Sequence, residues 1–133
     1  MEAIIVIGHG EFAGGLSKAL ELIMGKQEDY YFIDYNQDCN AGYLRHKLGE
    51  LLKGLKGKIY ICCDLLNGTP FNISLEYALN NDNITLLYGI NLPTLLQMIS
   101  QRMFENGEID AEKAISTGQE NMGILDKSIF SAE

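Results

Sequence analysis

Short apolar runs that stop at a glycine and lead into helical periodicity are the sequence feature that most restricts the fold. Residues 3–7 read AIIVI, a run rich in β-branched side chains that is typical of a strand buried on both faces. Gly8 ends this run, and apolar residues then recur at helical spacing from Phe12 to Ile23, with Gly25 placed to end the helix. The start of the chain therefore predicts a strand, a glycine turn and a helix.

The same unit recurs along the rest of the chain. Further strands are predicted at Tyr31–Tyr35, Lys58–Cys63 and Ile84–Tyr88, and a last short strand at Gly123–Phe130. Helices are predicted at Tyr43–Leu55, from Pro70 onward, at Thr94–Met103 and at Glu108–Asn121. Strands that alternate with helices form βαβ crossovers, so the predicted architecture is an α/β fold of three layers, a mainly parallel sheet with helices on both faces.

Composition narrows the class of protein. A chain of 133 residues predicts a single domain over residues 1–133, and 47% hydrophobic with 21% charged residues excludes disordered and coiled-coil classes. Ten Lys and Arg against eighteen Asp and Glu give 10 − 18 = −8. This charge disfavours binding to nucleic acid or anionic lipid and favours a protein partner with a basic face.

The amino-terminal residues and the cysteines indicate the compartment. The start MEAIIVIGHG lacks a basic region and a long apolar core, and no stretch approaches the roughly 18 apolar residues of a membrane span. Cys39, Cys62 and Cys63 form neither a disulfide framework nor a zinc-ligand pattern. We expect a cytoplasmic protein with no metal and no other cofactor.

Ligands of parallel sheets bind at the carboxyl ends of the strands, beside the point where strand order switches. The first loop there is Gly8-His9-Gly10, in which glycines leave the imidazole open and allow backbone N–H groups to turn toward an anion. A structural or solvent-facing role for His9 is the alternative. His46, between Arg45 and Lys47, is predicted to be a surface residue of a helix.

The loop from Asp64 to Pro70 is the second candidate. Asp64 ends a buried strand, where a carboxylate is costly unless it is hydrogen-bonded or belongs to a site. Thr69 precedes Pro70 and has two interpretations, either the N-cap of the helix or a hydroxyl for a bound phosphoryl group. If the first and third strands are neighbours, Asp64 fixes the tautomer of His9 and leaves the other ring nitrogen free as a nucleophile.

Two other chemistries fit parts of these loops. Gly8, Gly10 and Ala13 match the dinucleotide pattern G-x-G-x-x-G/A with Asp34 as a ribose-binding acid, and Asp64 could be the phosphoacceptor of a receiver-type domain. However, the loops carry no Lys or Arg, no P-loop motif occurs, and the acid pair of a receiver is missing after the first strand. A nucleotide-binding or receiver-like regulatory domain of flavodoxin-like type remains the alternative to a phosphohistidine carrier.

Three separated motifs, IIVIGHGEFAGGL, DLLNGTPFN and GINLP, resemble the IIA component of the mannose family of the bacterial phosphoenolpyruvate-dependent sugar phosphotransferase system. The resemblance covers essentially the whole chain. It implies a phosphotransferase component whose last strand is antiparallel and exchanged between the two subunits of a homodimer. It also implies that His9 accepts a phosphoryl group from the carrier HPr and passes it to the IIB component, which phosphorylates sugar entering through membrane subunits IIC and IID.

The resemblance also implies roles for single residues. Asp64 matches the family aspartate that pairs with the active histidine, and Thr69 matches the hydroxyl residue, commonly serine, of the segment G-G-S-P-F-N. Asn67 replaces the first glycine of that segment. We therefore expect His9 and Asp64 to be catalytic, with Gly10, Gly68 and Thr69 binding the phosphoryl group.

Overall fold

The structure is a computed structural model that describes residues 1–131. Its strands are β1 (Ala3–His9), β2 (Tyr30–Tyr35), β3 (Ile59–Cys63) and β4 (Ile84–Leu87). Its α-helices are α1 (Phe12–Met24), α2 (Ala41–Lys53), α3 (Thr69–Asn80), α4 (Leu92–Phe104) and α5 (Ala111–Glu120). The predicted alternation of strands and helices is confirmed.

The four strands form one sheet in the order β2-β1-β3-β4, and every pair is parallel. The chain leaves β1 toward one edge of the sheet and returns past it to β3, so the switch in strand order lies between β1 and β3. His9 ends β1, and Asp64 directly follows β3. The topology therefore brings the two predicted loops together.

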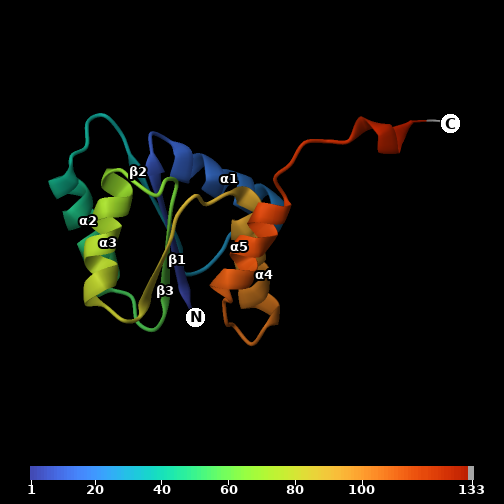
Figure 1. Ribbon diagram of the computed structural model, residues 1–133. Coiled ribbons are helices and arrows are strands. Elements are labelled where there is room, and N and C mark those ends of the chain that lie inside the picture. Colours follow the sequence, from blue (N-terminus) through green and yellow to red (C-terminus); the bar gives the residue numbers. More distant parts are fainter. Residues whose placement is uncertain (132–133) are drawn as a thin grey trace.

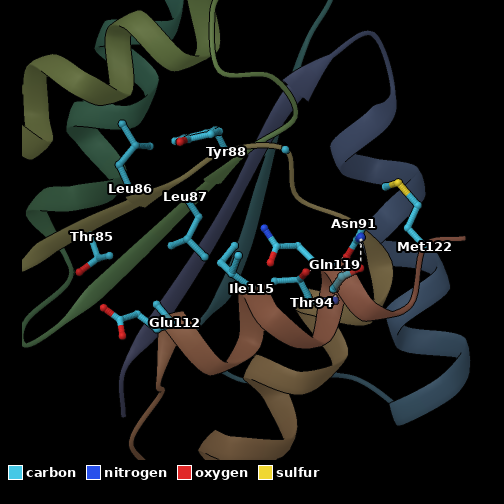
Figure 2. A pocket seen from close by; sticks show the side chains of 13 residues that line it. Thr85, Leu86, Leu87, Tyr88, Asn91, Thr94, Glu112, Ile115, Gln119 and Met122 are labelled. Atoms are coloured by element: carbon cyan, nitrogen blue, oxygen red, sulfur yellow. Dashed lines mark hydrogen bonds between the residues drawn. The ribbon is translucent and has the colours of Figure 1, made fainter.

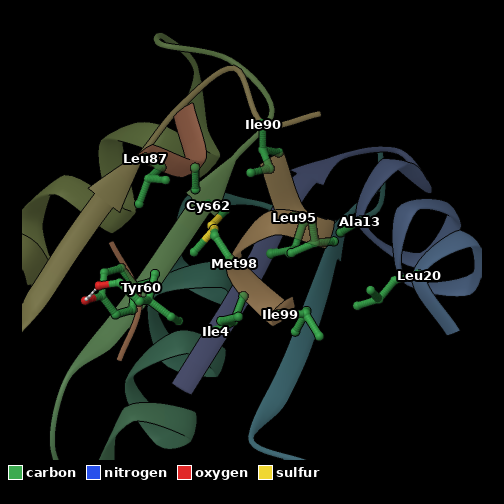
Figure 3. Packing of buried hydrophobic residues seen from close by; sticks show 13 residues of the cluster. Ile4, Ala13, Leu20, Tyr60, Cys62, Leu87, Ile90, Leu95, Met98 and Ile99 are labelled. Atoms are coloured by element: carbon green, nitrogen blue, oxygen red, sulfur yellow. Dashed lines mark hydrogen bonds between the residues drawn. The ribbon is translucent and has the colours of Figure 1, made fainter. Parts of the chain in front are cut away.

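Helices cover both faces of the sheet, as predicted (Figure 1). Ile4 and Val6 of β1 pack on the side of α1, α4 and α5, whereas Ile5 and Ile7 pack on the side of α2 and α3. Figure 3 shows the first of these cores, in which Leu95 of α4 lies among buried side chains from the strands and α1. Because β1 is buried on both faces, its apolar run has no alternation with polar residues.

The start of α5 differs from the prediction. A helix was expected from Glu108, but α5 begins at Ala111, and the Asp110 side chain caps it by accepting from the Lys113 N–H at 3.1 Å. Asn106 and Gly107 both have positive φ, at 58° and 78°, so the chain turns immediately before Glu108. The cap at Asp110, rather than periodicity, sets the helix boundary.

In the single chain the segment Gly123–Phe130, which was predicted as a strand, is not paired with the sheet. Residues 121–130 are all exposed, and Lys127–Phe130 form a 3₁₀ turn that begins after Asp126. Figure 1 shows this segment projecting away from the sheet. A strand needs a neighbouring strand for its backbone hydrogen bonds, and this segment has none within residues 1–131.

A buried arginine of α4 holds the end of the sheet that lies opposite the candidate loops. Arg102 donates hydrogen bonds to the backbone carbonyl oxygens of Glu2 at 2.7 Å, Glu28 at 2.6 Å and Asp29 at 3.0 Å. Burial lowers the pKa of the guanidinium, and the three carbonyl groups take the place of its water. Arg102 therefore anchors the amino-terminal ends of β1 and β2, far from the loops that follow their carboxyl ends.

Candidate functional site

His9 and Asp64 form the centre of the candidate site. The Asp64 Oδ2 atom lies 2.8 Å from His9 Nδ1 and accepts the His9 backbone N–H at the same distance of 2.8 Å. The contact that was predicted on condition that β1 and β3 are neighbours is therefore present. With Asp64 ionised, Nδ1 carries the proton and donates it to the carboxylate, so the lone pair of the ring is on Nε2.

The two side chains differ in exposure, and the difference suits their chemistry. The Asp64 side chain is 11% exposed and the His9 side chain 45%. The second carboxylate oxygen of Asp64, Oδ1, accepts the Leu65 N–H at 2.9 Å, so hydrogen bonds to both oxygens fix the carboxylate. The imidazole is thus held on its inner nitrogen and open to another molecule on its outer side.

Gly68 lies against the open side of the imidazole. A Cβ atom at this position would stand 3.1 Å from His9 Cε1 and 3.3 Å from Nε2, and the residue has a φ of 111°. A side chain here would crowd the ring, and its backbone conformation would be strained. Gly68 therefore lets the backbone of the β3–α3 loop approach the nitrogen that carries the lone pair.

The amino terminus of α3 adds hydrogen-bond donors beside the ring. Gly68 is the N-cap and Thr69 the first helical residue, so the interpretation of Thr69 as the N-cap is wrong. Within residues 1–131 the N–H groups of Gly68, Thr69 and Phe71 donate no hydrogen bond, whereas the Asn72 N–H donates to the Gly68 carbonyl at 2.9 Å. Free N–H groups and the positive end of the helix dipole favour an anion here.

Gly10 has a different local role. Its φ is 58°, which permits the tight turn between β1 and α1. Its N–H donates to the Tyr35 carbonyl at 2.8 Å, so this donor is paired inside the protein. The Gly10 N–H is therefore not one of the unpaired donors near His9.

Asp34, the predicted ribose-binding acid of the nucleotide alternative, caps α1 instead. Its Oδ1 atom accepts the Gly14 N–H at 2.8 Å, in the first turn of a helix whose N-cap residue Glu11 makes no side-chain hydrogen bond. The hollow beside it is lined by three acids, Glu11, Asp34 and Asp38. A carboxylate already fills this helix terminus and the surroundings repel phosphate, so the geometry disfavours a dinucleotide here.

The second histidine and the adjacent cysteines lie outside the candidate site. His46 is exposed on α2, as predicted. Cys62 and Cys63 are fully buried in β3, and burial raises the pKa of the Cys63 thiol to about 12. No helix among residues 1–131 combines the length and apolar character required to cross a membrane.

Tyr35 is a site residue that the sequence patterns did not indicate. Its ring centroid lies 6.1 Å from that of His9, and the two ring planes are 89° apart. The sequence did place Tyr35 at the carboxyl end of the second predicted strand, which is the end where a site is expected. Its contact with His9 depends on the β1–β2 register, which the apolar run of β1 does not specify because it is buried on both faces.

Known proteins resemble this chain in sequence and in fold. The mannose-specific EIIAB component of Escherichia coli (strain K12) is 30% identical over 131 residues, which are 94% of this chain and 40% of that protein. The fructose-specific EIIA component of Bacillus subtilis (strain 168) is 25% identical over 104 residues, 77% of this chain and 71% of that protein. The crystal structure of phosphotransferase system component EIIA from Streptococcus agalactiae superimposes with a TM-score of 0.82 at 31% identity, covering 97% of this chain and 99% of that one.

The family match covers all four strands and most of the helices. Residues 3–115 match the EIIA-man family, described as PTS system fructose IIA component, where PTS denotes the phosphotransferase system. This range includes the loops that carry His9 and Asp64 and the sheet that brings them together. On sequence and on fold alike, the chain belongs to the EIIA-man family of PTS IIA components.

Proposed function

We propose that residues 1–133 form a single PTS IIA domain that carries phosphoryl groups during sugar uptake. His9 accepts the group from the phosphohistidine of HPr and passes it to the cognate IIB component. The observation that carries the proposal is the hydrogen bond of 2.8 Å between Asp64 Oδ2 and His9 Nδ1. It leaves Nε2 as the nucleophilic ring nitrogen on the exposed side of the site.

The transfer balances without a cofactor. The Nε2 lone pair of His9 attacks phosphorus, the P–N bond of the donor phosphohistidine breaks, and its electron pair returns to the donor imidazole. The new bond leaves positive charge on the His9 ring, and the Asp64 carboxylate stabilises that charge through the Nδ1 proton. The second transfer, to IIB, is the same displacement with His9 as the donor.

The phosphoryl oxygens need their own partners. The N–H groups of Gly68 and Thr69 and the Thr69 hydroxyl belong to the amino terminus of α3, which approaches Nε2 at Gly68. We assign phosphoryl binding to them, and to Gly10 the turn that opens the other side of the ring. These dipoles stabilise the oxygens without holding the group as tightly as a lysine or arginine, which suits a carrier that must release it.

The surface around His9 fits protein partners with basic faces. Glu11 and Asp38 line the hollow next to the Gly8–Gly10 loop. In the loop between β3 and α3, Leu65 is 56% exposed and Leu66 is 47% exposed. Exposed apolar side chains beside acids suit docking to a protein, and they disfavour nucleic acid. HPr and IIB are the direct partners in this proposal, the membrane subunits IIC and IID are indirect ones, and the cytoplasm is where they meet.

The test is phosphorylation by the general PTS proteins. The chain is incubated with phosphoenolpyruvate, enzyme I and HPr, and the mass of the intact protein is measured. We expect the addition of one phosphoryl group that is stable in base and labile in acid, and that is lost again when IIB is added. A base-labile phosphate would indicate an acyl phosphate on an aspartate and thus the receiver alternative, and no phosphate at all would contradict the carrier role.

Asp64→Asn should leave the chain folded and slow phosphotransfer by roughly 10- to 100-fold, because an amide cannot balance the charge that develops on His9. Both carboxylate oxygens of Asp64 accept N–H groups, so the amide NH₂ also has to face a donor. Quench-flow measurement of transfer from phospho-HPr checks the rate. Asp34→Asn is the matched control, since Asp34 needs only one oxygen for Gly14 and should keep the wild-type rate.

The homodimer is a further part of the proposal. β4 is an outer strand of the sheet, and beside it lies a groove of about 490 Å³ between β4 and α5. In Figure 2, Leu87 of β4 and Ile115 of α5 face this groove. The projecting segment Gly123–Phe130 carries exposed apolar residues, namely Ile124, Leu125, Ile129 and Phe130. Antiparallel pairing of this segment with β4 of a second copy would cover both surfaces.

Deleting the residues after Asn121 should convert a dimer into a monomer of lower thermal stability. The deletion removes the segment that pairs with β4 of the other subunit and leaves the groove of Figure 2 uncovered. Sedimentation velocity at micromolar concentration measures the change. A full-length chain that sediments as a monomer, or a shortened chain that remains an equally stable dimer, would show that the segment is not exchanged.

A further inference from the structure

Three groups lie against the imidazole of His9, and two of them are side chains. Asp64 bonds Nδ1, the backbone of Gly68 approaches Cε1 and Nε2, and the ring of Tyr35 stands perpendicular to the imidazole. One hydrogen bond to Nδ1 fixes a single point of the ring. The plane of the imidazole can still rotate about that bond unless another group restricts it.

The backbone places Tyr35 firmly beside His9. The two residues are paired in the parallel register of β1 and β2, so their side chains project to the same face of the sheet. One residue beyond this pair, the Gly10 N–H donates to the Tyr35 carbonyl at 2.8 Å. The position of the tyrosine is therefore coupled to His9 and to the residue that follows it.

The aromatic contact has the geometry of an attractive pair. A centroid separation of 6.1 Å with planes 89° apart is an edge-to-face arrangement, within the range that aromatic rings prefer. Tyr35 is partly buried against the core of Ile7 and Ile33, so its own ring has limited freedom. It is the packed aromatic group that defines the orientation of an otherwise half-exposed imidazole.

We propose that Tyr35 is a positioning residue, whose ring holds the His9 imidazole in the orientation that directs Nε2 past Gly68 toward the incoming phosphoryl group. The consequence for rate rests on the proposed function, whereas the consequence for the motion of the ring does not. Reaction of two protein-bound imidazoles through one phosphorus requires alignment of both rings, so freedom of His9 lowers the fraction of productive encounters.

The experiment compares Tyr35→Leu with Tyr35→Phe and with Tyr31→Leu. Tyr31 is a matched control, because it belongs to the same strand, face and core cluster but pairs with Ile5 instead of His9. In Tyr35→Leu we expect phosphotransfer from HPr to fall roughly three- to tenfold, chiefly in kcat rather than KM. Tyr35→Phe keeps the ring and should restore the wild-type rate.

The ring itself is observed by ¹³C relaxation of the His9 Cε1–H group in solution. The order parameter should fall in Tyr35→Leu and stay at the wild-type value in Tyr35→Phe and Tyr31→Leu. Tyr35→Met, which fills the space without a planar ring, serves as a second test if the leucine variant does not fold. Equal order parameters and rates in folded Tyr35→Leu or Tyr35→Met and in Tyr31→Leu would overturn the proposal.

The two proposals can fail separately. If the wild-type chain takes no phosphoryl group, the carrier function is wrong, and the relaxation data still decide whether Tyr35 restrains the imidazole. If His9 is phosphorylated but its order parameter and the transfer rate do not change when the ring at position 35 is removed, the carrier function is supported and the positioning role is wrong.

Discussion

His9→Ala should abolish phosphorylation by the general PTS proteins, with no phosphate detected by intact mass. The substitution removes Nε2, the exposed ring nitrogen that Asp64 and Gly68 leave free to attack phosphorus. The fold should survive, because Asp64 keeps its hydrogen bonds to the backbone N–H groups of residue 9 and Leu65. Thermal unfolding followed by circular dichroism checks the fold independently of the phosphate.

His46→Ala is the control for that experiment. His46 is exposed on α2, on an element separate from the glycine loops, and its removal should leave the extent of phosphorylation unchanged. Phosphate that persists in the His9 variant would move the acceptor to another residue, and phosphate lost in the His46 variant would do the same. Both results would contradict the assignment of His9.

The second large effect is expected from Gly118→Ala in α5, which should reduce the free energy of unfolding by about 2–4 kcal/mol. A Cβ atom at position 118 would collide with the Thr94 side chain and stand 2.8 Å from Asn91 Oδ1. Asn91 caps α4 through the Thr94 N–H and also donates to the Gly118 carbonyl at 3.0 Å. The added methyl group therefore separates α5 from α4 and breaks the cap at once. Urea unfolding provides the measurement.

Gly15→Ala is the matched control for Gly118→Ala. Gly15 also lies inside a helix, but a Cβ there meets nothing within 4 Å. Alanine has the higher helix propensity, so this variant should be unchanged or more stable by up to about 1 kcal/mol. Equal stability of the two alanine variants would mean that α4 and α5 are not packed as closely as the structure shows.

Local patterns predicted the elements well because most of them are specified locally. The β-branched run before Gly8 and the helical spacing after Phe12 produced β1 and α1, with the helix ending directly before Gly25. β1 extends further than its apolar run predicted, since Gly8 and His9 still pair with Asp34 and Tyr35 of β2. Pairing across the sheet, which no local window contains, sets that end of the strand.

Contacts within the site were predictable only where one condition about strand order was assumed. The meeting of His9 with Asp64 followed from placing the first and third strands side by side, and the structure has them so. The sequence offered Asp34 only as a ribose-binding acid, and its bond to the Gly14 N–H, which caps α1, could not be read from the pattern. Tyr35 was missed because β1 is apolar on both faces, so its hydrophobic pattern does not specify the register with β2.

The conformation of the carboxyl-terminal segment could not be predicted for a related reason. Ile124, Leu125, Ile129 and Phe130 carry enough apolar surface to predict a strand, yet a single chain provides no strand to pair with them. The pattern of apolar residues indicates which side chains need to be covered. It does not indicate whether the surface that covers them belongs to the same molecule.

The three carbonyl bonds of Arg102 also bear on the order in which the domain can be completed during synthesis. The guanidinium reaches back to Glu2 across 100 positions of the chain, so the loop that it closes contains all four strands of the sheet. Of the four strands, β1 is translated first, yet its amino-terminal end stays without this anchor until α4 has been translated. The first of the strands therefore receives this anchor only after the whole sheet has been made.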